Sequence, residues 1–449
     1  MELNKIHSVY FLGIGGIGMS ALALYFIQKG VRVSGYDRVE TTLTRNLVSK
    51  GAHIVYEEEA NLCPYNVDLL VYTPAVPATH LSWQYIQEHA IPVKKRAEVL
   101  GMIADHYKTI GVAGTHGKTT ISTMITHILS NASIQCNAFL GGLSKNFDSN
   151  LLIAPQSDWM VVEADEFDRS FLQLHPWFSV VSAMDADHLD IYGDKQNLCK
   201  AFAEYVSQTN SHGLSFLKYG LPIQGSCTLT YHLQDVNADY YAENITIANE
   251  EYSFDLITPS GKIKALRMSY PGLHNIENAI VASAVALHCG VSEAELKQTL
   301  YSFKGVKRRF DYQIKTPNLI YIDDYAHHPN EIQACIESVR ELYPKRKITL
   351  IFQPHLYSRT RDFAADFVKS LGLVDTLILL DIYPARELPI EGVSSEMLKD
   401  KIKHIPVYLT HKKELLSLLQ TLSLDCLITM GAGDIDTLVL PIKKYLQNK

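Results

Sequence analysis

The sequence predicts an α/β protein of two or three domains, and three observations lead to this expectation. At 449 residues, the chain is long for a single hydrophobic core. Short apolar β-type runs alternate with amphipathic helical patterns along much of its length. Glycine-rich or polar segments follow several of these runs, which is where open parallel sheets hold their ligands.

The composition is that of a soluble globular protein, with 47% hydrophobic and 20% charged residues. The net charge of -7 and the lack of a Lys/Arg block give little support to binding of nucleic acid or an anionic membrane. The N-terminus lacks a signal-peptide pattern, and no run approaches the ~20 apolar residues of a membrane span. The seven cysteines form no C-x-x-C pair, so we expect them to be buried, reduced and free of zinc. Together these features indicate a cytoplasmic protein.

A βαβ pattern opens the chain. A strand is expected at Ser8–Leu12, a helix to about Gln28 and a second strand at Val31–Tyr36. Between the first strand and the helix lies a G-x-G-x-x-G turn, and an acidic residue follows the second strand; the residues concerned are Gly13, Ile14, Gly15, Gly16, Ile17, Gly18 and Asp37. Such a turn lets a pyrophosphate rest on the helix N-terminus. Alone, the pattern is typical of an NAD-dependent dehydrogenase, but UDP-sugars also carry a pyrophosphate, and a turn without a ligand remains an alternative.

A second glycine-bearing turn follows further β-type runs at Leu69–Tyr72 and Val93–Lys95, and a second domain is expected to start near Asp105. The turn lies between an apolar run, Thr109–Ala113, and a helical pattern, Ile121–Leu129; it consists of Gly114, Thr115, His116, Gly117, Lys118, Thr119 and Thr120. Backbone N–H groups and the helix dipole would face a phosphate there, Lys118 would reach the β- and γ-phosphates, and Thr119 would complete a Mg²⁺ shell. The strict P-loop pattern has a glycine where this chain has Val112, so an ordinary βα turn is the alternative. We predict a site for a nucleoside triphosphate.

Acidic segments follow two later β-type runs. Trp159–Val162 leads into Glu163-Ala164-Asp165-Glu166, and Ser179–Ala183 leads into a segment, 185–190, that contains His188. Mg²⁺ prefers one or two carboxylates together with phosphate oxygens and water. Both segments are therefore candidate metal sites beside the P-loop, with a solvated turn as the alternative for the first and a structural histidine for the second.

Residues 213 to 267 carry short β-type runs at Thr228–Tyr231, Tyr240–Ile247 and Tyr252–Leu256, which predict an antiparallel extension. A helix rich in alanine then extends to about His288. Asn275 near its start could offer the paired donor and acceptor that an adenine edge needs, or could cap the helix.

A third domain is expected to begin near the basic residues Lys307-Arg308-Arg309. The strands predicted there are Leu319–Ile322, Ile348–Phe352, Thr376–Leu380 and Cys426–Met430. Polar tips follow them and include His328, His355 and Arg359. Because parallel strands end at one edge of a sheet, these tips should form one rim that faces a ligand.

In this order, the motifs resemble those of the Mur ligase family over essentially the whole chain. The matching motifs are G-T-x-G-K-T at Gly114–Thr119, E-x-D-E at Glu163–Glu166, H-N-x-x-N-A at His274–Ala279 and D-Y-A-H-x-P at Asp324–Pro329. The resemblance implies three domains: a UDP-substrate-binding Rossmann-like domain in residues 1–104, a central P-loop ATPase domain with a mostly parallel sheet in 105–305, and a C-terminal Rossmann-like domain in 306–449.

The resemblance also implies an ATP-dependent, amide-forming enzyme of bacterial cell-wall synthesis. The N-terminal G-I-G-G-I-G-M-S and the C-terminal F-Q-P-H, Y-P-A-R-E and G-A-G-D-I are similar to those of members that join L-alanine to the lactyl carboxylate of UDP-N-acetylmuramate through an acyl phosphate. A recycling ligase that adds a whole peptide to the same sugar nucleotide is the closest alternative. A dehydrogenase and a nucleotide-dependent binding module are alternatives from other classes.

By resemblance, individual residues receive roles. Thr119 and Glu163 would hold Mg²⁺, His188 would help to hold a second metal, and Lys118 would act on the ATP phosphates. The residues expected to contact ATP from elsewhere are Asn275, Arg309 and Asp324. The glycine turn at 13–18 and Asp37 would bind the UDP pyrophosphate rather than NAD, and His328, His355 and Arg359 the amino acid. An arginine often follows the Q-P-H histidine in this group, but this chain has Leu356 at that position. Arg359 is therefore the candidate for binding the carboxylate of the amino acid.

Overall fold

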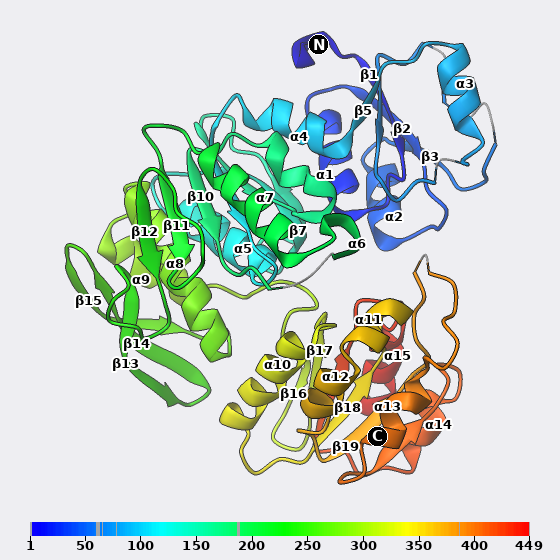
Figure 1. Cartoon of the computed structure of the whole chain (residues 1–449), viewed down its shortest axis with the longest axis vertical. Coiled ribbons are helices and arrows are strands. Elements are labelled where there is room, and N and C mark those ends of the chain that lie inside the picture. The colour runs from blue at the N-terminus through cyan, green and yellow to red at the C-terminus, as the bar shows by residue number, and fades with distance from the viewer. Residues whose placement is uncertain are drawn as a thin grey trace. The chain divides into compact units, whose positions relative to one another are not determined.

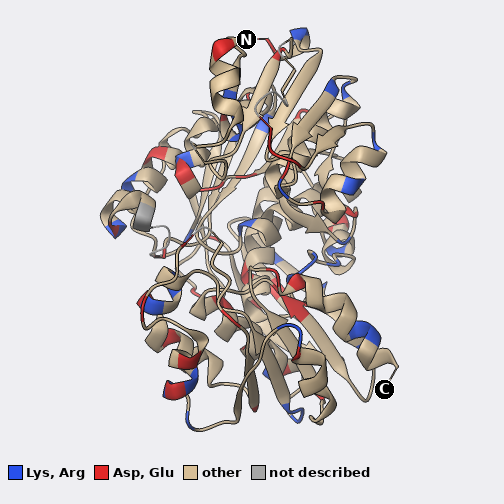
Figure 2. Ribbon diagram, turned by 90° about the vertical axis from the view of Figure 1, so that its right-hand side faces the viewer, with Lys and Arg blue, Asp and Glu red and all other residues tan. Residues whose placement is uncertain are grey.

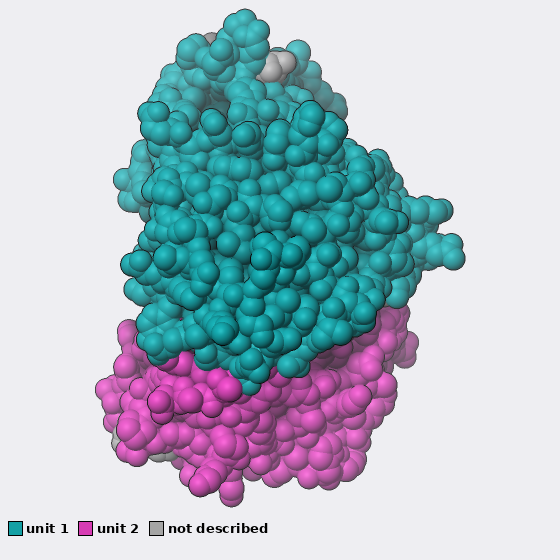
Figure 3. All heavy atoms as spheres, turned by 90° about the vertical axis from the view of Figure 1, so that its left-hand side faces the viewer, with its two compact units in different colours: residues 1–245, 253–268, 276–304 teal, residues 246–252, 269–275, 305–449 magenta. Residues whose placement is uncertain are grey.

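The computed structural model describes residues 2–59, 63–64, 66–77, 79–185, 189–385 and 387–448. The chain divides into two compact units (Figure 3). Unit 1 comprises residues 1–245, 253–268 and 276–304, and unit 2 comprises residues 246–252, 269–275 and 305–449. The three largest sheets lie at 8–95 and 108–231 in unit 1 and at 311–430 in unit 2 (Figure 1). The α/β class is confirmed, while the predicted domain boundaries stay a prediction.

The first sheet of unit 1 is a parallel, five-stranded sheet with the order β3-β2-β1-β4-β5. Its strands are β1 (Ser8–Leu12), β2 (Arg32–Tyr36), β3 (His53–Val55), β4 (Leu69–Tyr72) and β5 (Val93–Lys95). Its helices are α1 (Ile17–Gln28), α2 (Thr42–Ser49), α3 (Ser82–Glu88) and α4 (Arg96–Ala104). The strand order reverses between β1 and β4, so the glycine turn after β1 lies at a topological switch point. The predicted βαβ start is confirmed.

The second sheet of unit 1 has seven strands in the order β12-β11-β10-β6-β9-β7-β8. At its centre, β6 (Lys108–Ala113) pairs in parallel with both β9 (Trp159–Glu163) and β10 (Phe178–Val181). The P-loop and the two acidic segments therefore follow three neighbouring strands, as the sequence predicts. At one edge, β7 (Asn137–Ser144) pairs in parallel with β9 and antiparallel with β8 (Ser149–Leu152). After β6, α5 (Lys118–Asn131) is buried from Thr119 to Leu129.

The predicted antiparallel extension is wrong for its first run. β12 (Thr228–Tyr231) pairs in parallel with β11 (Leu214–Lys218), which continues the central sheet beside β10. Residues 219–227 carry the chain back without a helix, and a β-type run does not reveal the direction of its pairing. The other two runs correspond to β13 (Tyr241–Ala248) and β14 (Glu251–Thr258), which form a separate sheet with β15 (Gly261–Met268), a strand that was not predicted. Two-residue turns join them, so these neighbours are antiparallel as predicted.

Further helical elements follow in the central part of the chain. They are the 3₁₀ segment Phe167–Gln173, α6 (Leu189–Tyr192), α7 (Lys195–Ser207), α8 (Leu273–His288) and α9 (Glu293–Tyr301). The alanine-rich helix predicted to end near His288 is confirmed as α8.

Unit 2 holds a six-stranded sheet with the order β16-β17-β21-β18-β19-β20. Only β16 pairs antiparallel among these strands; they are β16 (Asp311–Lys315), β17 (Ile320–Asp324), β18 (Ile348–Phe352), β19 (Thr376–Leu379), β20 (Val407–Leu409) and β21 (Cys426–Met430). The helices are α10 (Pro329–Leu342), α11 (Tyr357–Asp362), α12 (Ala364–Leu371), α13 (Ser395–Lys401), α14 (Leu415–Gln420) and α15 (Asp436–Gln447). The carboxyl ends of β17, β21, β18 and β19 adjoin at one edge of the sheet, as predicted, while a ligand at this rim stays a prediction.

Charged residues of both signs are interspersed along the ribbon (Figure 2). All seven cysteines are free thiols, and Cys63, Cys136, Cys289, Cys335 and Cys426 are buried. The expectation of burial is wrong for Cys227, which is exposed because it lies in the loop before β12, and Cys199 is only half-buried. Within the described ranges, no helix is both long and apolar enough to cross a membrane.

Candidate active site

The turn between β6 and α5 needs glycine at two positions. Gly114 and Gly117 have φ angles of +133° and +83°, a region that L-residues rarely adopt. A Cβ on Gly114 would collide with Ser182, and one on Gly117 would lie 2.9 Å from Asn278 Oδ1. Val112, at the position where the strict P-loop pattern has a glycine, is a buried residue of β6. The strand β6 extends one residue beyond it, to Ala113.

Lys118 is held beside this turn by two oxygen-bearing groups. Its Nζ donates to the Gly114 carbonyl at 2.7 Å and lies 2.8 Å from Glu166. The Lys118 side chain is 15% exposed and that of Glu166 is 1% exposed. Burial alone would lower the pKa of Lys118, but the nearby carboxylates of Glu166, Asp165 and Glu163 outweigh burial and raise this pKa above its usual value. Lys118 is therefore a charged group placed where the helix N-terminus also favours an anion.

Thr119 and Glu163 form an oxygen pair on the other side of the turn. Thr119 Oγ1 donates to Glu163 Oε1 at 3.1 Å, and the Gly141 N–H donates to Glu163 Oε2 at 3.0 Å. Gly141 has no room for a Cβ, because the Glu163 carboxylate fills that space. A hydroxyl and a carboxylate next to a phosphate turn fit Mg²⁺, which needs few protein ligands. Among the described residues, no group of three or more His, Cys, Asp or Glu side chains could hold a metal alone.

The acidic segment after β9 does not act as one cluster. Glu163 lies against Thr119, Glu166 holds Lys118, and Asp165 Oδ2 lies 3.3 Å from Arg96 Nη2. Sequence reasoning assigned a role to Glu163 and missed both Glu166 and Arg96. Glu163 and Glu166 are the same residue type, and they differ in the direction in which their side chains point. The sequence does not encode that direction. The second predicted metal ligand, His188, lies outside the described residues.

The N-terminal glycine turn is closed by its own backbone and by Asp37. Gly13 and Ile14 donate to the Tyr36 carbonyl at 2.8 and 3.0 Å, and the Gly15 N–H donates to Asp37 Oδ2 at 2.7 Å. The N-cap of α1 is Gly16, with no side-chain cap and no acidic residue in the first turn. The Asp37 carboxylate therefore occupies one N–H group of the turn, while the first turn of α1 holds no acidic side chain and can still receive a pyrophosphate. The predicted UDP role of Asp37 stays a prediction, since its carboxylate orders the turn.

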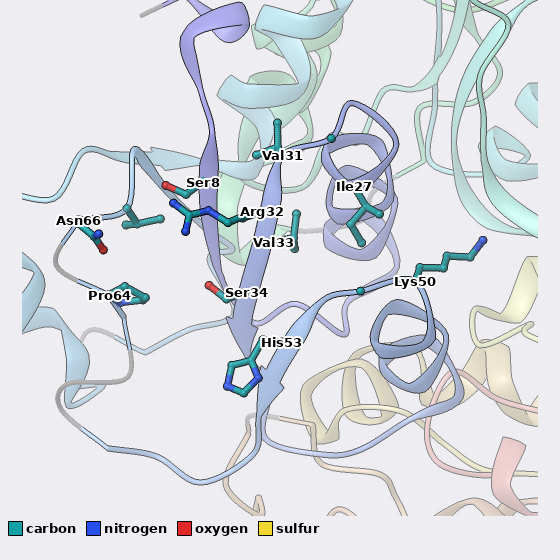
Figure 4. Close-up of a pocket in the computed structure, with 13 residues that line it drawn as sticks. Ser8, Ile27, Val31, Arg32, Val33, Ser34, Lys50, His53, Pro64 and Asn66 are labelled. Atoms are coloured by element: carbon teal, nitrogen blue, oxygen red, sulfur yellow. The ribbon is translucent and has the colours of Figure 1, made fainter.

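A cavity of about 520 Å³ lies at the opposite edge of the same sheet (Figure 4). Ser8, Arg32 and His53, which line it, are the first residues of β1, β2 and β3, whereas the glycine turn follows the end of β1. Its lining also includes Gly30 and Lys50, at the C-terminal ends of α1 and α2. Helix C-termini carry partial negative charge, which the two cations Arg32 and Lys50 offset. This cavity is therefore not the predicted pyrophosphate site.

In unit 2, the rim of the sheet brings His355 and Arg359 together and adds His327. The His355 ring stacks on Tyr383 with centroids 5.7 Å apart, and the His327 centroid lies 6.0 Å from that of His355. Burial lowers the pKa of each histidine to about 4, and Arg359 lies close enough to lower both further. Both rings are neutral at neutral pH. His355 Nδ1 is a buried polar atom without a hydrogen-bond partner among the described residues.

His328, by contrast, caps a helix. Its side chain accepts the Asn330 N–H at 3.4 Å at the start of α10, and its ring contacts Phe363 edge-on at 4.9 Å. Sequence reasoning selected His328 and missed His327. Pro329 was the available signal, because a proline at the first helical position makes the preceding residue the N-cap. An amino-acid role for His328 stays a prediction.

The residues predicted to reach ATP from the C-terminal side also lie in unit 2. Both oxygens of Asp324 accept backbone N–H groups, from Phe310 and Ala326, each at 2.7 Å. The Arg309 guanidinium lies over the Tyr325 ring at 5.1 Å. Asn275 is 2% exposed and donates its amide to the Pro271 carbonyl. These contacts order the backbone around the three predicted residues, and their roles toward ATP stay predictions.

Three family models match successive parts of the chain. The Mur ligase family catalytic domain matches residues 8–108, the Mur ligase middle domain 112–286 and the Mur ligase glutamate ligase domain 308–433. The UDP-N-acetylmuramate–L-alanine ligases of Christiangramia forsetii and Flavobacterium psychrophilum are 50% and 49% identical to this chain. These alignments cover 99% of both chains for the first and 100% of both for the second.

Solved structures give the same architecture. The UDP-N-acetylmuramate–alanine ligase of Thermotoga maritima superposes with a TM-score of 0.85 at 27% identity, covering 98% of this chain and all of that one. A murein peptide ligase of Psychrobacter arcticus superposes with a TM-score of 0.72 at 21% identity, covering 99% of both chains. At that identity, the second likeness concerns the fold alone.

Proposed function

Because the chain belongs to the Mur ligase family, we propose that it joins L-alanine to UDP-N-acetylmuramate at the expense of ATP, as a step in peptidoglycan precursor synthesis. The observation that carries this proposal is 50% identity over essentially the full length to a UDP-N-acetylmuramate–L-alanine ligase. The chemistry is supported by the placement of Lys118, Thr119 and Glu163 around one glycine turn. A carboxylate is a poor acyl donor, and ATP can convert it into a good one.

In the first step, an oxygen of the lactyl carboxylate attacks the γ-phosphorus of ATP. The bond between that phosphorus and the β–γ bridging oxygen breaks, so ADP leaves and an acyl phosphate forms. Two anions must approach each other, and such transfers are accelerated mainly by positioning and by positive charge. Lys118 supplies a charge that its neighbouring carboxylates keep protonated.

Thr119 and Glu163 are the residues that would hold Mg²⁺. Bound there, the ion would neutralise charge on the phosphate oxygens. The resemblance assigns His188 to a second metal, and that role stays a prediction. Glu163 keeps one oxygen on the Gly141 N–H, which fixes the carboxylate beside the turn.

In the second step, the neutral amine of L-alanine attacks the acyl carbon, phosphate leaves, and the nitrogen loses one proton. We assign the α-carboxylate of L-alanine to Arg359, whose planar fork can bind it with two hydrogen bonds. His355 is a neutral imidazole near Arg359 with a buried nitrogen that lacks a partner among the described residues. It can therefore accept a hydrogen bond from the incoming amine.

One assay tests the proposal: release of phosphate from ATP with UDP-N-acetylmuramate and each of several acceptors. We expect turnover with L-alanine, slower turnover with glycine and L-serine, and none without an acceptor. Turnover with L-Ala-γ-D-Glu peptides that matched or exceeded turnover with L-alanine would assign the chain to peptide recycling instead. Absence of phosphate release with every acceptor would refute the ligase proposal.

A further inference from the structure

Arg96 lies against the N-terminus of α1. It is the first residue of α4 and directly follows β5. A Cβ on Gly18 would lie 2.7 Å from Arg96 Nη1 and 3.2 Å from Arg96 Cδ. Gly18 is the second residue of α1. A glycine at this position therefore leaves room for the guanidinium beside the first turn of the helix.

Most of the hydrogen-bonding capacity of Arg96 is unused. A guanidinium has five N–H donors, and across the described residues only Nη2 of Arg96 has an acceptor, Asp165 Oδ2 at 3.3 Å. The side chain is nevertheless 20% exposed, which is low for an arginine with one partner. The other nitrogens of Arg96 are not among the buried polar atoms that lack a partner, so they reach solvent and can donate to a ligand.

The first turn of α1 suits the same kind of ligand. Its N-cap, Gly16, provides no side-chain acceptor, and the first turn contains no acidic residue. Backbone N–H groups and a guanidinium thus face one place next to the glycine turn. Pyrophosphate oxygens can accept from both, and the planar fork of arginine matches phosphate geometry.

We propose that Arg96 binds the pyrophosphate of the sugar nucleotide, an inference that rests on the proposed function. Asp165 then acts as a positioning residue, because it holds one edge of the guanidinium and leaves the other edge to the substrate. Asp165 also adjoins Glu166, which holds Lys118. The two nucleotide sites therefore share one acidic segment, with Arg96 on the sugar-nucleotide side and Lys118 on the ATP side.

The test measures binding of UDP-N-acetylmuramate and of UDP by calorimetry without ATP, so that it does not depend on turnover. Arg96→Gln should weaken both ligands by a similar factor of about 10 to 100, because the lost bonds go to the pyrophosphate that the two ligands share. Arg96→Lys should retain part of the affinity, since it keeps the charge and loses the fork.

Lys95→Gln is the matched control. Lys95 is the preceding residue and pairs with Asp168 at 2.9 Å, in the 3₁₀ segment that follows Glu166. Its side chain is 44% exposed, and the three atoms nearest a Cβ on Gly18 all belong to Arg96. It should change both affinities by less than about twofold, as expected for an exposed ion pair. Asp165→Asn is the second control. It removes the ion pair with Arg96 but keeps the guanidinium, so it distinguishes binding of the ligand by Arg96 from the structural ion pair between Arg96 and Asp165. It should weaken UDP much less than Arg96→Gln does.

Three outcomes would overturn the inference. Unchanged binding of both ligands in Arg96→Gln would show that the guanidinium makes no ligand contact. Equal losses of affinity in Arg96→Gln and Asp165→Asn would show that Arg96 acts only through its structural ion pair with Asp165. A loss of affinity for UDP-N-acetylmuramate but not for UDP would place the contact on the sugar. If the wild-type protein bound UDP but released no phosphate with any acceptor, the proposed function would be refuted. UDP binding by Arg96→Gln would then still test whether Arg96 contacts the pyrophosphate.

Discussion

Lys118 Nζ lies 2.8 Å from the carboxylate of Glu166, and the Glu166 side chain is 1% exposed. A buried carboxylate that loses its cation is destabilised far more than an exposed one. The lysine expected to act on ATP therefore also stabilises the protein before any nucleotide arrives. Substitutions at this pair affect the fold and the chemistry together, and the two effects can be separated.

Lys118→Ala should abolish phosphate release and lower the free energy of unfolding by about 3–5 kcal/mol, because Glu166 is left buried without its cation. The double variant Lys118→Ala/Glu166→Gln should recover much of that stability and none of the activity. Denaturant unfolding and the phosphate-release assay measure the two effects. UDP-N-acetylmuramate binding should stay largely intact, since it is assigned to the N-terminal glycine turn. Near-normal turnover in Lys118→Ala would refute the P-loop assignment.

Glu163→Ala should raise the Mg²⁺ concentration needed for half-maximal rate by at least about tenfold. The reason is that Glu163 is the carboxylate paired with Thr119 beside the P-loop. His188→Ala should shift the requirement in the same direction, as the family resemblance predicts. Asp168→Ala is the control, because Asp168 lies just after this acidic segment, in the 3₁₀ segment Phe167–Gln173, and pairs with Lys95. If both Glu163→Ala and His188→Ala kept the wild-type Mg²⁺ dependence, neither residue would be a metal ligand.

Arg359→Lys should raise the KM for L-alanine strongly and leave the KM values for ATP and UDP-N-acetylmuramate nearly unchanged. Lysine keeps the positive charge but cannot bind a carboxylate through a planar fork. Glycine should still react, because one methyl group contributes only ~1–3 kcal/mol of discrimination. Initial rates with each substrate varied in turn test this. The exposed Arg361, in the same helix, provides the control as Arg361→Lys. An unchanged KM for L-alanine would remove Arg359 from the acceptor site.

The stability of the protein should fall as the pH drops from about 6.5 toward 4, in part because of His127. Burial lowers the pKa of His127 to about 4, although the bond to the Thr299 carbonyl opposes this. The folded state therefore binds fewer protons than the unfolded state within this window, so acid favours unfolding. The stabilisation is fully present above the unfolded pKa and is lost as the pH falls to the folded pKa.

For one histidine, this difference amounts to about 3 kcal/mol. His127→Gln should flatten the pH dependence of the free energy of unfolding between pH 6.5 and 4, while lowering stability at neutral pH. His212→Gln, on an exposed loop, should leave the slope unchanged. Equal slopes in the wild-type protein and in His127→Gln would show that His127 does not contribute to the pH dependence.

The sequence by itself determined the features that depend on local structure. The run before Gly114 and the pattern after Lys118 predict a strand, a turn and a helix, because apolar periodicity and glycine conformations are properties of neighbouring residues. The same reasoning located β1, β18 and β21 at their observed bounds. The order of the motifs then indicated the family, and the strand ends indicated which edges of the sheets carry the functional residues.

The tertiary structure alone decided which side chains meet. Glu163, Asp165 and Glu166 are almost adjacent in the chain, yet each has a different partner. Glu166 lies 48 residues from Lys118, and Asp165 lies 69 residues from Arg96. The direction of β12 and the proximity of His327 to His355 were likewise decided by the tertiary structure. Such contacts depend on how distant segments pack, and packing is set by the whole fold rather than by any local pattern.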